Sequence, residues 1–245
     1  MKILKKTGAV ALLILTAAAG CSTVPRDFSA HTPMGLVMVL SNQNINWFDE
    51  RNPSSDGDIA DLIRNLLGTE SDGTTVRDSR ADFIVNEADT ILRIFLTEAG
   101  VFNLADKEHV ILNRDYAAAP QGRTPSNQIT AQGYRYINYR DSEFNTRISG
   151  AMGLQSLLYV TFEFSKEMIS GFGRTGRARV RVAMNTIMVN SAGRVMYRDE
   201  IITHSRETMD VSSGFYLEEE LMDLFIEAIG EACYYFVRQF QGSQI

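Results

Sequence analysis

The sequence predicts an α/β (α+β) fold, in which amphipathic helices pack on a mixed sheet that ends in an antiparallel three-stranded meander. Three observations predict it. Residues 34–40 (MGLVMVL) are apolar throughout, which is typical of a central strand buried on both faces. Apolar and polar residues alternate over 158–164, 178–184 and 195–204, as in strands with one buried face. Apolar residues recur at helical spacing over 216–240.

The first 20 residues have the pattern of a secretory signal peptide. An apolar run over 9–15 follows a positively charged start, and small residues follow the run. The run is too short for a transmembrane helix, which needs about 20 apolar residues. The positive charges are Lys2, Lys5 and Lys6.

Cys21 directly follows these small residues, and the arrangement resembles a bacterial lipobox, in which the cysteine is acylated and becomes the N-terminus. The alternative is ordinary cleavage after Ala19, which would release a soluble periplasmic protein. We expect lipidation of Cys21 and a tether over 21–33. The polar part of that tether would reach at most ~40 Å. Ser22 favours the outer membrane, with the protein facing the periplasm.

Composition limits the partners and the redox chemistry. Removal of the signal lysines changes the net charge from −6 to −9, because 21 basic and 30 acidic residues remain. An acidic chain does not suit nucleic acid, and it leaves membrane anchoring to the lipid. With Cys21 acylated, Cys233 has no disulfide partner, and its helical spacing with apolar neighbours predicts a buried thiol.

The chain from 34 to 245 is expected to form one globular domain. After the first strand, a polar loop carries Trp47 and Phe48. Apolar periodicity and terminal glycines at 68 and 100 then predict helices. These expected elements are helices over 58–67, 79–99 and 106–112, with a short strand over 101–105.

Residues 113–140 form the least regular stretch, which we interpret as a surface insertion. Long irregular loops in compact domains are often functional. Tyrosine and arginine are favoured at protein interfaces, although tyrosines also simply cover the edge of a core. We expect a partner-binding surface here, with a second patch at Trp47 and Phe48. The residues of the partner-binding surface in 113–140 are Tyr134, Arg135, Tyr136, Tyr139 and Arg140.

A short helix over 141–152, stopped by Gly153, leads into the meander. Each of its strands is expected to have one dry and one wet face. A turn that pairs Val189 with Arg194 would set Arg181 opposite Ile202. It would also make Glu200 a diagonal neighbour of Arg181. The row Arg177, Arg179 and Arg181 is then a solvated, partly paired face or, alternatively, the docking face for an acidic partner.

No catalytic or metal-binding pattern stands out. Residues 171–176 (GFGRTG) match a phosphate-binding glycine motif in letters, but a strand follows where a helix N-terminus is needed. We therefore expect turn glycines and no cofactor. His31, His109 and His204 lack partners at zinc-ligand spacing.

The order of the elements resembles an envelope-lipoprotein group that includes the curli secretion lipoprotein CsgG, the penicillin-binding-protein activator LpoB and the N-terminal domain of TolB. The segments that carry the resemblance are MGLVMVL, ILRIFLTEAG, VFNLADKEHVIL, ISGAMGLQSLLYVTFEF and IMVNSAGRVMYRDEI. The resemblance implies an α/β domain without catalytic residues that works by contact with envelope proteins. The arginine-bearing hairpin does not suit a pore, and the short tether does not suit an activator that spans the cell wall.

These observations together predict a lipid-anchored, periplasm-facing envelope lipoprotein that acts as a non-catalytic interaction or assembly module. One alternative is a subunit of an oligomeric secretion or export complex, and a homo-oligomer is compatible with either role. The other alternative is an enzyme acting on envelope material.

Overall fold

The computed structural model describes residues 24–25, 28–48, 79–119, 127–172 and 175–241. The expected signal peptide, Cys21 and the expected helix over 58–67 lie outside these ranges. The elements are η1 Phe28–His31, β1 Met34–Asn42, β2 Asn46–Trp47, α2 Ser79–Glu98, α3 Lys107–Ile111, α4 Arg114–Ala117, β3 Gln128–Thr130, α5 Ser142–Met152, β4 Ser156–Phe172, β5 Thr175–Asn190, β6 Val195–His204, β7 Met209–Val211 and α6 Glu218–Gln241.

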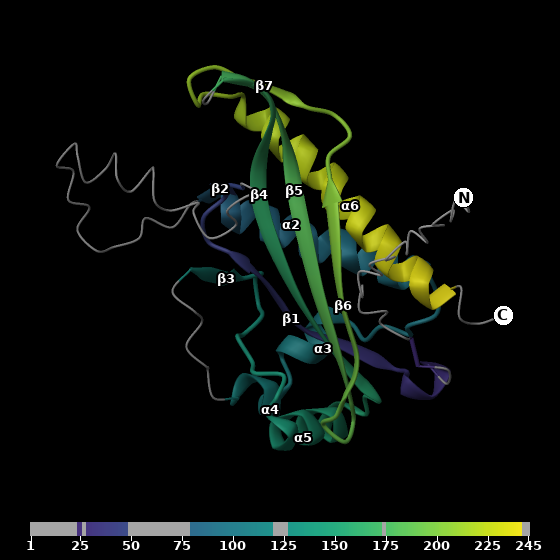
Figure 1. The fold of residues 1–245 in the computed structure, drawn as a ribbon. Coiled ribbons are helices and arrows are strands. Elements are labelled where there is room, and N and C mark those ends of the chain that lie inside the picture. The colour runs from purple at the N-terminus through teal and green to yellow at the C-terminus, as the bar shows by residue number, and fades with distance from the viewer. Residues whose placement is uncertain (1–23, 26–27, 49–78, 120–126, 173–174, 242–245) are drawn as a thin grey trace, which may run out of the picture.

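The predicted fold class is confirmed. One mixed sheet has the strand order β3–β1–β4–β5–β6, with β2 beside β4 and β7 beside β5 (Figure 1). Strand β1 runs parallel to β4, whereas β4, β5 and β6 form the expected antiparallel meander. Helices α2 and α6 pack together over one face of the sheet, which we call the helix face.

Strand β1 is buried on both faces, as its uninterrupted apolar sequence predicts. Leu36 and Val39 contribute to the core under α2 and α6, while Val37, Met38 and Leu40 contribute to a second core on the opposite face. The pairing with β4 is irregular between Leu36 and Met38. Such a bulge lets two successive side chains point to the same face.

The second core corrects the expectation that one face of the meander is wet. Near the start of β4, this opposite face is covered by α4 and α5 (Figure 1). Leu157 and Tyr159 are therefore as buried as their neighbours on the helix face. Alternation over 158–164 marked the two faces correctly, but Tyr159 on the expected wet face belongs to a core.

Part of the expected tether belongs to the fold. Phe28 is buried, with its ring centroid 4.7 Å from that of Phe240 and 5.4 Å from that of Phe102. The Ser156 hydroxyl also donates a hydrogen bond to the His31 carbonyl over 2.7 Å. The packed part of the chain therefore begins no later than Phe28.

Two other local expectations are wrong. Residues 101–105 do not form a strand; only Leu104 bridges to Met34, and Phe102 fills the core. The stretch 113–140 is not simply an insertion on the surface. It supplies β3, which pairs with β1, and it buries Ile129 and Ile137.

The register of the last hairpin also differs from the expectation. Arg181 lies opposite His204, and Glu200 lies opposite Asn185. Val189 pairs with Val195 rather than Arg194, and a pairing irregularity between Met188 and Val189 shifts the register by one more residue. The error arose because a bulge next to a turn changes which residues oppose each other along the whole hairpin.

Helix α6 buries the predicted stripe, which includes Leu221, Leu224, Ala228, Phe236 and Cys233. Leu217 is an exception, since it precedes the helix and is 65% exposed.

We predict that Phe236→Ala lowers the free energy of unfolding by about 3–5 kcal/mol, because it removes a fully buried ring. Tyr235→Ala on the same helix should cost less than ~1 kcal/mol, since Tyr235 is half exposed. Urea unfolding of both variants measures the difference. Equal losses would show that α6 does not bury its apolar stripe against the sheet.

Candidate functional site: a tyrosine-lined hollow and the ion network behind it

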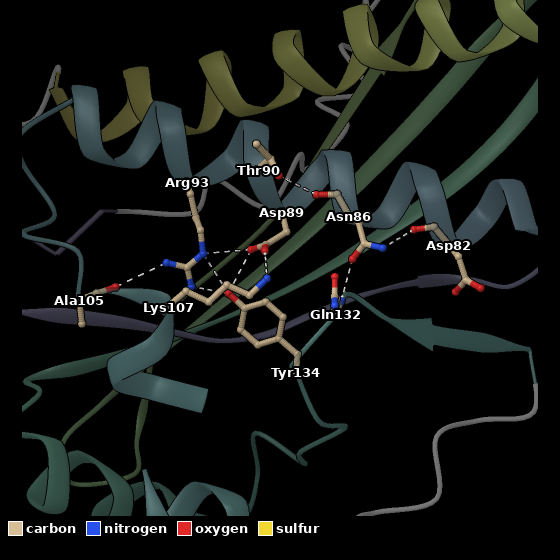
Figure 2. Close-up of polar contacts among 9 residues, drawn as sticks. All are labelled: Asp82, Asn86, Asp89, Thr90, Arg93, Ala105, Lys107, Gln132 and Tyr134. Carbon is tan, nitrogen blue, oxygen red and sulfur yellow. Dashed lines mark hydrogen bonds and ion pairs between the residues drawn. The ribbon is translucent and has the colours of Figure 1, made fainter. Parts of the chain in front are cut away.

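Asp89 of α2 is the centre of a polar network that ties three parts of the chain together (Figure 2). Its side chain is 4% exposed. Arg93 Nε lies 3.1 Å from Asp89 Oδ1, and Lys107 Nζ lies 2.5 Å from Oδ2. The Tyr134 hydroxyl donates to Asp89 Oδ1 over 3.0 Å and accepts hydrogen bonds from Arg93. The network therefore joins α2, α3 and the chain after β3.

Tyr134 belongs to this network and is buried, so the prediction that it is an exposed binding residue is wrong. Burial raises the pKa of the Tyr134 phenol, and the adjacent Asp89 charge raises it further against the opposing effect of Arg93. The phenol therefore stays protonated and can donate to Asp89. Both Asp89 oxygens already have partners, which indicates a structural role for the network.

Further contacts fix the course of the chain beyond Tyr134. The amide of Arg135 donates to the Tyr116 hydroxyl over 3.0 Å, and that hydroxyl donates to the Val37 carbonyl over 2.8 Å. Burial raises the pKa of Tyr116 to about 12. The Asn145 side-chain amide donates to the Tyr139 carbonyl over 2.7 Å. Residues 134–139 are thus held at both ends.

Between these anchored ends, the chain borders a hollow on the face of the sheet opposite α2 and α6. Its volume is about 170 Å³. The floor comes from β1, β4 and β5, while one wall comes from 136–139. The lining carries aromatic, aliphatic, amide and hydroxyl groups and no charged residue. It consists of Met38, Leu40, Gln128, Tyr136, Ile137, Asn138, Tyr139, Tyr159, Thr161, Asn185 and Ile187. We call it the tyrosine hollow.

Two guanidinium groups meet at Tyr139, on the rim of the tyrosine hollow. Arg140 Nε donates to the Tyr139 hydroxyl over 3.1 Å, and Arg198 Nη2 donates over 3.0 Å. They lie 5.5 and 5.7 Å from the ring centroid, within cation–π range. The hydrogen bond from Arg140, assisted by the charge of Arg198, lowers the pKa of Tyr139. We call Tyr139, Arg140 and Arg198 the arginine rim.

The structure brings four of the predicted binding residues to this region. Tyr136 and Tyr139 line the hollow, Arg140 is exposed on its rim, and Arg135 is half-buried beside Tyr136. Sequence reasoning missed Arg198, which lies on β6 far along the chain. Its position in the alternation of β6 marked it as pointing to the open face, but nothing indicated that the loop would reach it.

Trp47 and Phe48 do not form a separate exposed patch. Lys166 Nζ lies 5.2 Å from the Trp47 ring centroid, and the Arg181 guanidinium lies 4.2 Å from that of Phe48. Both aromatic residues are half-buried. They therefore attach β2 to the sheet through cation–π contacts, each worth ~0.5–2 kcal/mol depending on desolvation.

The remaining motifs have structural explanations. Gly171 and Gly176 oppose each other in the β4–β5 hairpin with positive φ values, consistent with turn glycines. Arg179 Nε forms an ion pair with Glu167 over 2.6 Å, and His204 Nε2 lies 3.5 Å from the same carboxylate. Among the described residues, no group of three histidine, cysteine or carboxylate side chains could hold a metal ion.

The chain matches no known family model and no curated protein sequence. The crystal structure of "a putative lipoprotein from Caulobacter crescentus CB15" is similar at 11% identity, over 42% of this chain and 81% of that chain, with a TM-score of 0.23. Across the part of the chain that the structure describes, no helix has both the length and the hydropathy to span a membrane.

We predict that Asp89→Ala lowers the free energy of unfolding by about 2–4 kcal/mol, because it leaves Arg93 and Lys107 without their buried counter-charge. The low end of this range allows for the partial exposure of the Arg93 and Lys107 side chains. Arg206→Ala removes surface ion pairs and should cost at most ~1 kcal/mol. Chemical denaturation measures the free energy of unfolding of both variants. A small loss for Asp89→Ala would show that residues 134–139 do not depend on the network.

Proposed function

We propose that this protein is a lipid-anchored, periplasm-facing envelope lipoprotein of the outer membrane, acting as a non-catalytic interaction module. The signal pattern and Cys21 support the anchoring. Cys21 and Phe28 are seven positions apart, which limits their separation to about 25 Å. Since Phe28 packs on Phe240, the C-terminal end of α6 would stay near the bilayer.

The observation that carries the interaction role is the tyrosine hollow. Tyr136 and Tyr139 present aromatic surface on a chain segment whose ends are already fixed, so little conformational entropy is lost when a partner binds. Aromatic residues next to arginine are typical of binding hot spots. A partner protein that inserts a side chain into the hollow would use both.

A second candidate function is that of a subunit in an oligomeric export complex. One observation favours it. The tip of the β4–β5 hairpin lies near the start of α6 (Figure 1), and exposed apolar side chains occur on both segments. Helix α6 is ~36 Å long, so these side chains lie far from Phe28. They are Ile169, Phe172, Phe215 and Leu217, with exposed fractions of 46, 93, 80 and 65%.

We predict that the native protein incorporates labelled palmitate, that Cys21→Ala abolishes the labelling, and that the labelled protein fractionates with the outer membrane. Acylation of Cys21 supplies the lipid on which the proposed anchoring depends. Gel autoradiography of separated inner- and outer-membrane fractions measures the labelling and the location of the protein. An unlabelled soluble protein cut after Ala19 would overturn the lipid anchor.

We predict that Tyr136→Ser with Tyr139→Ser abolishes crosslinked capture of a partner from membranes and leaves the thermal midpoint nearly unchanged, since neither side chain is fully buried. Tyr234→Ser with Tyr235→Ser is the matched control, because these rings form an exposed pair on α6. Equal capture by both variants would exclude the hollow as the binding surface, whereas loss of capture by the control alone would place the interface on α6.

A further inference from the structure

We infer that the tyrosine hollow and the arginine rim together bind the C-terminal residue of a peptide, with its side chain in the hollow and its carboxylate on Arg140 and Arg198. The inference rests on the proposed function, since it names the chemistry of the partner segment at the same site. Tyr139 carries it, because this one residue both lines the hollow and receives the two guanidinium groups.

The charge of the rim is the first reason. The mature chain is strongly acidic, yet two guanidinium groups converge here. Among the described residues, neither Arg140 nor Arg198 has a carboxylate within ion-pair distance, in contrast to Arg93, Arg179 and Arg206. Guanidinium groups bind carboxylates through paired, charge-assisted hydrogen bonds.

Two of the nearby carboxylates are engaged elsewhere. Asp141 accepts from the Phe144 amide and caps α5, while Asp199 accepts from Gln239 and Tyr197 on the helix face. One exception is Glu163, which is exposed on β4 two residues beyond Thr161 of the lining. The other is Glu200, which accepts from Asn185 of the lining over 3.4 Å. Its charge opposes an incoming anion, which gives the inference an additional test.

The hollow is the second reason. A cavity of ~150 Å³ lined by apolar side chains admits a benzene molecule. The tyrosine hollow, at about 170 Å³, therefore suits a single aromatic or branched aliphatic side chain. Its uncharged lining leaves the rim as the place for the carboxylate, and amide groups such as Asn138 and Gln128 are available to the peptide backbone.

The adjacency of rim and hollow favours a C-terminus over an internal acidic residue. In a C-terminal residue, the carboxylate and the side chain leave the same Cα. An internal acidic residue carries its carboxylate on its own side chain, which separates the charge from the neighbouring apolar group. Tyr139 belongs to both the hollow and the arginine rim, so the bound carboxylate and the bound side chain must lie close together, as they do in a C-terminal residue. A peptide that ends there needs no exit path beyond the hollow.

The test uses the purified native lipoprotein in detergent and fluorescein-labelled peptides, with binding measured by fluorescence anisotropy. The probes are a Gly-Ser hexamer ending in Phe with a free carboxylate, the same peptide amidated, the same peptide ending in Gly, and an amidated peptide with an internal Asp-Phe pair. We expect the free Phe peptide to bind at least ~10-fold more tightly than each of the others.

Variants connect this preference to the site. Arg140→Ala with Arg198→Ala should reduce the preference for the free carboxylate to about 2-fold or less, and Glu200→Gln should strengthen binding by about 2- to 5-fold. Arg177→Ala removes an exposed arginine near the far end of β5 and should change nothing. Circular dichroism checks that each variant folds.

The outcomes separate this inference from the proposed function. Equal binding of free and amidated peptides, or no binding of either, overturns the C-terminal carboxylate. If membrane capture still depends on Tyr136 and Tyr139 in that case, the proposed interaction role stands without it. Tighter binding of the internal Asp-Phe peptide would replace a C-terminus by an acidic internal segment. Loss of the preference in Arg177→Ala would place the anion site elsewhere on β5.

Discussion

The buried carboxylate of Asp89 makes the contacts on which the position of residues 134–139 depends. A nearly inaccessible charge needs counter-charges and hydrogen bonds, and it receives them from Arg93, Lys107 and Tyr134. These residues come from α2, α3 and the chain after β3. Satisfying one carboxylate therefore requires three separate segments to come together, and a chain region with little regular structure gains a defined position.

The position of that region determines the geometry of the candidate site. Once Tyr134 is held on α2, the following residues border the face of the sheet opposite α2 and α6. The amide of Arg135 donates there to Tyr116, and the carbonyl of Tyr139 accepts from Asn145. The side chains between these anchors then face β1, β4 and β5 and enclose the tyrosine hollow. A binding surface on such a segment combines the sequence freedom of a loop with the rigidity of a packed element.

The sheet itself separates two kinds of surface. Its helix face is closed by α2 and α6 around a large apolar core that also takes in Phe28. Within the described residues, its other face is covered by α4 and α5 near the start of β4, and by residues 136–139 where they border the hollow. The hollow lies where cover gives way to the open part of this face. Aromatic surface meets there with the guanidinium groups of the arginine rim, which donate to the Tyr139 hydroxyl.

The sequence alone determined the elements whose local pattern is strong. The apolar run of β1, the alternation of the meander and the stripe of α6 predicted their type and their buried side, because periodicity depends only on the backbone geometry of each element. The tertiary structure alone decided the rest. Tyr134 is core while Tyr136 is surface, although the two look alike in sequence, because a carboxylate 45 positions earlier captures only the first. Arg198 reaches Tyr139 through a register that the turn pairing and one bulge set together. Contacts between residues so far apart in the chain leave no local pattern, so only the packed structure reveals them.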